Sequence, residues 1–591
     1  YTVGTTISGG TLVATNVDAL GSGDVTDDAT LELNTGGTFD NAISGSGQVV
    51  KSGDKMLTLS GTNSYSGGTL ISGGTLVATN VDALGSGDVT DDATLELNTG
   101  GTFDNAISGS GQVVKSGDDT LTLSGSNTYT GGTIISGGTL VASNVEALGT
   151  GDVTNDAVLE LNTGGDFDNA ISGSGQVVKS GDETLTLSGS NTYTGGTLIS
   201  GGTLVASNVE ALGSGDVTND AVLELNTGGD FTNAISGSGQ VVKSGDETLT
   251  LSGANSYTGG TLISGGTLIA SNVEALGTGD VTDNAVLELN TGGDFDNAIS
   301  GSGQVEKSGD ETLTLSGANS YTGGTLISSG TLVANDVNAL GTGDVTDNAV
   351  LELNTGGTFD NAISGSGQVV KSGDETLTLS GSNTYTGGTT INDGTLIATS
   401  VDALGSGDVT DNAVLELNTG GDFDNAISGS GQVVKSGDET LTLSGTNSYT
   451  DGTLISGGTL VATNLEALGT GDVTNNATLE LNTGGTFDNA ISGSGQVVKS
   501  GDDALTLSGS NTYTGGTTIS GGTLIATSVD ALGSGDVTDN AVLELNTGGT
   551  FDNAISGSGQ VVKSGDKTLT LSGSNTYTGG TTISGGTLIA S

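Results

Sequence analysis

Short runs in which apolar and polar residues alternate occur throughout the chain. A run from Thr75 reads TLVAT, a run from Thr94 reads TLELN, and a run from Thr120 reads TLTLS. The second and fourth residues of each run are apolar while the others vary, which is typical of a β-strand with one buried face. The predicted inward residues are Leu76, Ala78, Leu95, Leu97, Leu121 and Leu123, and the predicted outward residues are Val77, Glu96 and Thr122.

Helical structure is not expected anywhere in the chain. No stretch sustains an apolar period of 3.6 residues, and the 108 glycines among 591 residues seldom leave room for a helix. Further β-like segments are predicted at residues 103–107, 112–115 and 133–136. They are separated by Gly-Gly, Ser-Gly and Asn-Thr-Gly corners, which favour turns.

The whole pattern returns every sixty-four residues without an insertion or deletion. Tyr1 falls in phase with Tyr65, so the chain comprises nine repeats and fifteen further residues. We therefore predict that residues 1–591 form one continuous segment, cut from a longer protein, in which each repeat packs on its neighbours. The glutamine that opens the recurring QVVK phrase, which reads QVEK in the fifth copy, marks the nine copies at Gln48, Gln112, Gln176, Gln240, Gln304, Gln368, Gln432, Gln496 and Gln560.

Within a repeat, a shorter spacing indicates the architecture. The Thr-Leu starts at Thr75, Thr94, Thr120 and Thr139 are separated by nineteen, then twenty-six, then nineteen positions. A coil of roughly twenty residues with about three short strands is the size of one turn of a β-solenoid. The predicted fold is all-β, a right-handed parallel β-solenoid (β-helix) with about three coils per 64-residue repeat. A spacing of about 4.8 Å between strands then gives a rise of about 14 Å per repeat.

Differences among the repeats indicate which side chains face solvent. Val50 is replaced by Glu306 in the fifth repeat, whereas the preceding position, Val49 or Val305, stays apolar. Met56 likewise stands where other repeats have threonine. Because a one-residue shift would exchange the two faces of a strand, we expect the variable positions to point outward.

Composition and charge exclude several classes of function. The chain has no Cys, His, Trp, Pro or Arg, so an enzyme would have only carboxylates, hydroxyls and a few lysines for its chemistry. Sixty-eight acidic residues against eleven lysines give a net charge of −57, with no basic face for a nucleic acid. No apolar stretch reaches the twenty residues of a transmembrane helix. We therefore expect a non-enzymatic protein that binds no nucleic acid and has no transmembrane helix in this segment.

One recurring phrase carries a resemblance to a known family. LTLSGSNTYTGGTTISGGTL, from Leu505 to Leu524, resembles the autotransporter-associated β-strand repeat of bacterial surface passengers. The match lies in the LTLSG strand, the NTYTGG corner and the TISGGTL return. The resemblance implies export to the outer cell surface and a role in adhesion, aggregation or biofilm formation. No translocator barrel, protease-like domain or tip domain accompanies the repeats in this sequence, so a catalytic passenger would need a domain outside these residues.

Two functional hypotheses follow. The first is a structural or adhesive extracellular rod at a bacterial cell surface, whose partners are other cell surfaces or copies of itself and which supports attachment or biofilm. The second is a binding module that presents a Ca²⁺ or glycan site in each repeat, with avidity gained from repetition. Dependence on Ca²⁺ would favour the second hypothesis.

The candidate calcium ligands are Asp88, Asp91 and Asp92, because closely spaced carboxylate oxygens are the donors that Ca²⁺ accepts. Asp and Asn exchange freely at these positions between repeats, and turn chemistry accounts for that exchange as well. The spacing also differs from the GGxGxD nonapeptide of calcium-binding β-rolls. The sequence therefore leaves open whether any metal is bound.

Three other motifs have simpler structural interpretations. The GSGQ and GSGD phrases lack the context of a phosphate-binding loop and are predicted to be turns. Phe103 is expected in the core and Tyr129 at a corner rather than in a glycan groove. Outward pairs such as Thr120 and Thr122 occur in one coil of three, too sparsely for a flat ice-binding array.

Overall fold

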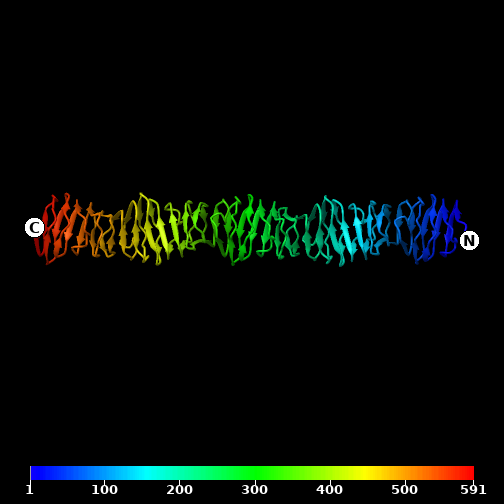
Figure 1. Cartoon of the computed structure of the whole chain (residues 1–591), viewed down its shortest axis with the longest axis horizontal. Helices are drawn as coiled ribbons and strands as arrows, with labels where there is room; N and C mark the ends of the chain where they lie inside the picture. The colour runs from blue at the N-terminus through cyan, green and yellow to red at the C-terminus, as the bar shows by residue number, and fades with distance from the viewer. Residues whose placement is uncertain (1) are drawn as a thin grey trace. The chain divides into compact units, whose positions relative to one another are not determined.

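The computed structural model describes residues 2–591, which form two compact units, one ending at Asn290 and the other beginning at Thr291. Each unit is a stack of short strands, all paired in parallel. The colour in Figure 1 advances steadily along each stack, so every coil lies beside those that precede and follow it in sequence. No helix occurs in residues 2–591. The predicted parallel β-solenoid is therefore confirmed within each unit, while one continuous segment over residues 1–591 stays a prediction, and Tyr1 lies outside the described residues.

Each repeat contributes eight strands, whose bounds recur with the period of the sequence. In the repeat that follows Tyr129 they are β17 (Thr133–Ile135), β18 (Thr139–Ala142), β19 (Val153–Asn155), β20 (Val158–Leu161), β21 (Gly165–Phe167), β22 (Ile171–Ser172), β23 (Gln176–Lys179) and β24 (Thr184–Leu187).

A coil passes through three strands on three faces before it returns to its starting face. β19, β20 and β21 form one coil, and β22, β23 and β24 form the next. Val158 of β20 is in register with Gln176 of β23, so this coil takes eighteen residues. Other coils take nineteen residues, as from Thr139 to Val158, or twenty, as from Val177 to Thr197.

The core consists of the inward residues that the alternation predicts. Leu76, Leu95 and Leu121 are fully buried, as are Ala78, Leu97 and Leu123. Glu96 and Thr122 are half-buried on the outer side, and Val77 retains slight exposure there. The predicted inward face is confirmed, and the predicted outward positions hold for Glu96 and Thr122, whereas Val77 is only 6% exposed and counts among the buried residues.

The variable positions also lie where the repeats predict. Val49 and Val305 are fully buried, whereas Val50 and its counterpart Glu306 are half-buried on the outer side. Met56 is 57% exposed. Differences between repeats therefore identified solvent-facing positions correctly.

The number of coils per repeat follows from the pairing. Within the first unit, seven parallel pairings carry one column of strands from Gly37 to Ile171. The mean coil along this column is about 19 residues, so a 64-residue repeat winds about three and one third coils. The prediction of about three coils per repeat is confirmed. The additional third of a coil changes how successive repeats are oriented.

The extra third explains the irregular 26-residue spacing. Thr75 pairs with Thr94 one coil later, but Thr94 then pairs with Gln112 rather than with Thr120. Leu121, next to Thr120, pairs instead with Gly101 in another column. The 26-residue step is thus one coil plus one face. The three Thr-Leu runs therefore do not stack in a single column, as their alignment in the sequence suggested. Each repeat is consequently turned by about a third of a revolution from the last, and its rise is about 16 Å rather than 14 Å.

Two face positions in each repeat carry no strand. One holds Asn127, and the other holds the turn from Asn144 to Gly149. The eight strands and these two segments make ten faces, which is three coils and one further face. The predicted β-like segment at 103–107 is also divided, because a corner separates β13 (Gly101–Phe103) from β14 (Ile107–Ser108) on the next face.

Candidate functional site

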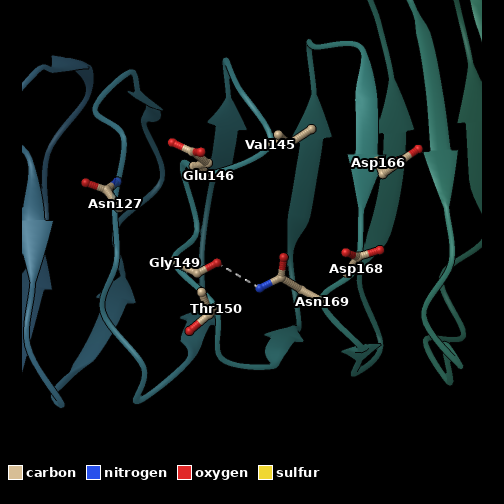
Figure 2. Close-up of a pocket in the computed structure, with 8 residues that line it drawn as sticks. All are labelled: Asn127, Val145, Glu146, Gly149, Thr150, Asp166, Asp168 and Asn169. Atoms are coloured by element: carbon tan, nitrogen blue, oxygen red, sulfur yellow. Dashed lines mark hydrogen bonds between the residues drawn. The ribbon is translucent and has the colours of Figure 1, made fainter.

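A shallow hollow on the surface recurs in several repeats and is the best candidate for a binding site. The copy in Figure 2 has a volume of about 340 Å³, and two further copies have volumes of about 250 and 240 Å³. The residues that line the first are Asn127, Val145, Glu146, Gly149, Thr150, Asp166, Asp168 and Asn169. The second is lined by Val401, Asp402, Gly405, Ser406, Asp408, Asp422, Asp424 and Asn425, and the third by Val81, Asp82, Gly85, Ser86, Asp88, Thr102, Asp104 and Asn105.

Three successive coils build the hollow. Figure 2 shows Asn127 on the first coil, Glu146 and Gly149 on the second, and Asn169 on the third. Asn127 donates a side-chain hydrogen bond to the carbonyl oxygen of Ala147 at 2.6 Å. Asn169 donates to the carbonyl oxygens of Gly149 at 3.1 Å and Gly151 at 2.6 Å. Two asparagine side chains therefore fix the floor of the hollow by joining each coil to the next.

The rim of the hollow is acidic. Glu146, Asp166 and Asp168 are exposed, and Asp168 accepts a hydrogen bond from the Ser188 hydroxyl. In the copy near Asp402 four aspartates stand around the rim. Carboxylates and backbone carbonyls accept hydrogen bonds, so the hollow suits hydroxyl-rich or cationic ligands rather than anions.

Most of the lysines are buried, so few positive charges remain at the surface to offset the acidic residues. One lysine per repeat lies at an inward position; Lys115, for example, is fully buried and donates to the carbonyl oxygens of Ser116 at 2.6 Å, Gly117 at 2.8 Å and Gly137 at 3.2 Å. Burial lowers the pKa of Lys115, while Asp119 and Asp118 oppose this shift. Only Lys55 and Lys567 of the eleven lysines are exposed among the described residues. The other nine are Lys51, Lys115, Lys179, Lys243, Lys307, Lys371, Lys435, Lys499 and Lys563.

The three candidate calcium ligands occupy different positions. Asp88 is exposed and lines a hollow. Asp91 lies on β11 (Val89–Asp91) rather than in a turn, and its side chain is fully buried. Asp92 is exposed and accepts hydrogen bonds from the Ser110 backbone N–H at 3.1 Å and hydroxyl at 3.3 Å. Among residues 2–591 no three carboxylate, His or Cys side chains are grouped to hold a metal ion.

The aromatic residues belong to the interior. Phe103 is 1% exposed, and Tyr129 is fully buried with its hydroxyl 2.7 Å from the Thr133 hydroxyl. Burial raises the pKa of Tyr129, so its hydroxyl stays protonated. The expectation that these rings are structural is confirmed. The acidic hollows were not predicted, since their residues come from three coils and the coil register was needed to bring them together.

Comparison with known proteins identifies the repeats. The passenger-associated-transport-repeat family matches nine segments, each of which runs from the QVVK strand to the end of the TLVA or TLIA strand. A haemagglutinin repeat matches residues 2–42. No solved structure matches the chain. The nine segments are residues 49–78, 113–142, 177–206, 241–270, 305–334, 369–398, 433–462, 497–526 and 561–590.

Two curated proteins are similar over parts of their length. The adhesin BmaC autotransporter of Brucella suis biovar 1 (strain 1330) is 30% identical over 610 residues, which is 88% of this chain and 16% of that protein. The uncharacterized lipoprotein YdeK of Escherichia coli (strain K12) is 33% identical over 198 residues, which is 32% of this chain and 15% of that protein. The chain thus spans about a sixth of the length of either relative.

The described residues include no helix long and apolar enough to cross a membrane. The nine matched repeats and the similarity to an autotransporter adhesin together confirm the expected family and location: the chain is a repeat region of an autotransporter passenger, displayed outside the cell at the bacterial surface.

Proposed function

We propose that this passenger region is an adhesive extracellular rod that attaches bacterial cells to one another or to other surfaces and thereby supports biofilm formation. The observation that carries the proposal is the recurrence of one acidic hollow in repeats that are each turned by a third of a revolution. Similarity to a protein named as an adhesin supports it. Weak contacts at many copies would add to strong attachment through multivalency.

The rotation between repeats gives the adhesive surface no preferred side. The hollows at Asp82 and Glu146 are one repeat apart and so open on different faces. A solenoid of this design meets partners around its whole circumference. The proposal assigns the chain no catalytic role, and its lack of His, Cys and Arg supports that assignment.

A binding test separates the hollows from general surface charge. Beads coated with the chain should adhere to bacterial cells, and Asp166→Asn, Asp168→Asn, Asp422→Asn and Asp424→Asn together should weaken adhesion several-fold. The matched control removes four exposed carboxylates outside the hollows with Asp182→Asn, Glu183→Gln, Asp438→Asn and Glu439→Gln. Equal adhesion by both variants would contradict a role for the hollows, and no adhesion by the unaltered chain would overturn the function.

A glycan is the second candidate ligand. A hollow of about 340 Å³ falls within the size range of small-molecule sites, and its carboxylate and amide groups can bind sugar hydroxyls. The calcium proposal rests on Asp88, the one of the three candidate ligands that lines a hollow. Glycan-array binding with and without EDTA tests both ligands. Binding that EDTA abolishes supports calcium, binding that it leaves unchanged supports a glycan alone, and no binding excludes the second candidate.

A further inference from the structure

An acidic side chain faces the interior once in most repeats, and asparagine replaces it in the others. Asp91 represents the aspartate form and Asn155 the asparagine form, and both side chains are fully buried. The aspartate form occurs at Asp27, Asp91, Asp283, Asp347, Asp411 and Asp539, and the asparagine form occurs at Asn155, Asn219 and Asn475.

The asparagine form has a hydrogen bond that the aspartate form lacks. Asn155 accepts from the Ala157 backbone N–H at 3.2 Å and donates through Nδ2 to the Gln176 carbonyl oxygen on the next coil at 2.9 Å. Asn219 and Asn475 donate to their glutamine carbonyls at the same distance. Both polar atoms of the asparagine side chain are thus hydrogen-bonded, and the bond from Nδ2 joins one coil to the next.

The aspartate form keeps only half of this arrangement. Oδ1 of Asp91 accepts from the Ala93 backbone N–H at 3.0 Å, as Asn155 does from Ala157. Oδ2 is buried and has no hydrogen-bond partner in any of the six aspartate repeats. An ionised carboxylate can only accept hydrogen bonds, so it cannot bond to the glutamine carbonyl that the amide reaches. A protonated carboxyl can donate to that carbonyl from Oδ2.

Close packing leaves the carboxyl little freedom. A Cβ added to Gly111 on the next coil would collide with the carboxyl atoms of Asp91, so glycine backbone covers this side chain directly. The charged or titratable groups that interact with it are Asp92, which directly follows the strand, and Tyr129, two coils further on; at Asp411, Asp451 adds to them. None of these groups supplies a positive charge. The backbone N–H groups of Ala93 and Leu95 favour the ionised carboxyl, but burial outweighs them, so the environment favours the neutral form.

We propose that the six inward aspartates are acid-operated latches between coils, each of which donates a hydrogen bond to the glutamine carbonyl of the next coil when protonated and loses it when ionised. In the three asparagine repeats the side-chain amide makes the same hydrogen bond between coils at every pH. The solenoid is therefore fastened more firmly in acidic surroundings than in neutral ones. This device is independent of which ligand the surface hollows bind.

The direction of the pH dependence follows from the burial of the carboxyl. Burial raises the pKa of Asp91 to about 6, and the same cause raises it to about 6 at Asp283, Asp347 and Asp411. An aspartate in an unfolded chain has a pKa of about 3.9. Between these values the folded chain holds more protons than the unfolded chain, so stability falls as pH rises from about 4 to about 6 and then levels off.

Thermal unfolding of the full chain at pH 8 and pH 5 tests the latch. The unfolding temperature of the unaltered chain should be several degrees higher at pH 5 than at pH 8. Replacement of the six aspartates by asparagine should raise the unfolding temperature at pH 8 and remove most of the gain, since three repeats already fold with asparagine there. The matched control removes six exposed carboxylates from the same repeats and should keep the gain. It carries Asp24→Asn, Asp88→Asn, Asp280→Asn, Asp344→Asn, Asp408→Asn and Asp536→Asn.

Infrared spectroscopy gives an independent readout of protonation. The folded chain should show the carbonyl stretch of protonated carboxyls at pH 5 and lose it with a midpoint near pH 6, and the six-asparagine variant should lack that component. The converse variant, with Asn155→Asp, Asn219→Asp and Asn475→Asp, should enlarge both the band and the pH dependence. An unchanged acid gain in the six-asparagine variant, or no such band in the unaltered chain, would overturn the proposal.

Discussion

Asn127 donates its side-chain N–H to the Ala147 carbonyl oxygen at 2.6 Å, and its side-chain oxygen accepts the Ile107 backbone N–H at 2.7 Å. One amide thus joins three coils at a face position that has no strand. The side-chain amide makes the hydrogen bonds that strand backbone groups make elsewhere. Neighbouring coils therefore stay hydrogen-bonded at this face although it has no strand.

Removal of this amide should weaken the coil locally. Asn127→Ala would leave the buried Ile107 N–H and Ala147 carbonyl unpaired, at a cost of about 1–3 kcal/mol for each group. Hydrogen exchange at the Ile107 amide should accelerate. Thr128→Ala, which shortens the exposed neighbouring side chain, is the control and should leave exchange unchanged. Equal protection of Ile107 in both variants would show that the amide bridge is dispensable.

Lysine burial predicts a small set of reactive amines. Of the eleven lysines, an amine-reactive reagent applied to the folded chain should modify only Lys55 and Lys567, because the other nine are fully buried. Mass spectrometry of peptides should find those nine unmodified until the chain is unfolded. Rapid labelling of Lys115 in the folded chain would contradict its placement among the three carbonyl groups.

Close approach between coils predicts which glycines tolerate a side chain. A Cβ at Gly111 would collide with the Asp91 carboxyl, so Gly111→Ala should destabilise its coil by about 1–3 kcal/mol through overpacking. Gly9→Ala is the control, because nothing lies within 4 Å of a Cβ placed there. Hydrogen exchange at the neighbouring amides measures the effect, since a solenoid opens locally. Similar exchange in the two variants would argue against this packing.

Much of the fold is predictable because the strands carry a strict period of two. Leu95 and Leu97 alternate with Glu96, and this local pattern fixes the buried face without knowledge of distant partners. The exact repeat length likewise shows that each repeat packs on its neighbours. These signals are local or periodic, so a single sequence suffices to detect them.

The coil register was less accessible because two face positions per repeat lack alternation. The side chain of Asn127 replaces a strand there, and no apolar pattern marks it. The 26-residue step from Thr94 to Thr120 was the available signal, since it exceeds the 19-residue step by about one face. Because the extra third of a coil was not recognised in the sequence, the residues that line each hollow could not be predicted to lie close together.

The burial of charged residues could have been inferred from their position in the strand. Lys115 shares the inward parity of Val113, and Asp91 shares that of Val89. Charge argued for exposure in both cases, but the three carbonyl acceptors of Lys115 and the backbone donor of Asp91 come from turns and neighbouring coils. Most of these backbone groups are near in sequence, but only the folded turns bring them to the two side chains.

The central claim is that each repeat winds three and one third coils, so that its strands change column. In the structure Glu96 lies beside Val114 on the next coil, whereas Thr122 lies beside Thr102 in a different column. The chain has no cysteine, so introduced pairs can be tested without background. Neighbouring strands lie within the Cα separation that a disulfide requires.

Disulfide formation in the folded chain tests this claim most directly. We predict that Glu96→Cys with Val114→Cys forms a disulfide within the chain, and that Glu96→Cys with Thr122→Cys does not. Mass spectrometry under mild oxidation measures both. A disulfide between positions 96 and 122, with none between positions 96 and 114, would place the three aligned runs in one column and contradict the extra third of a coil.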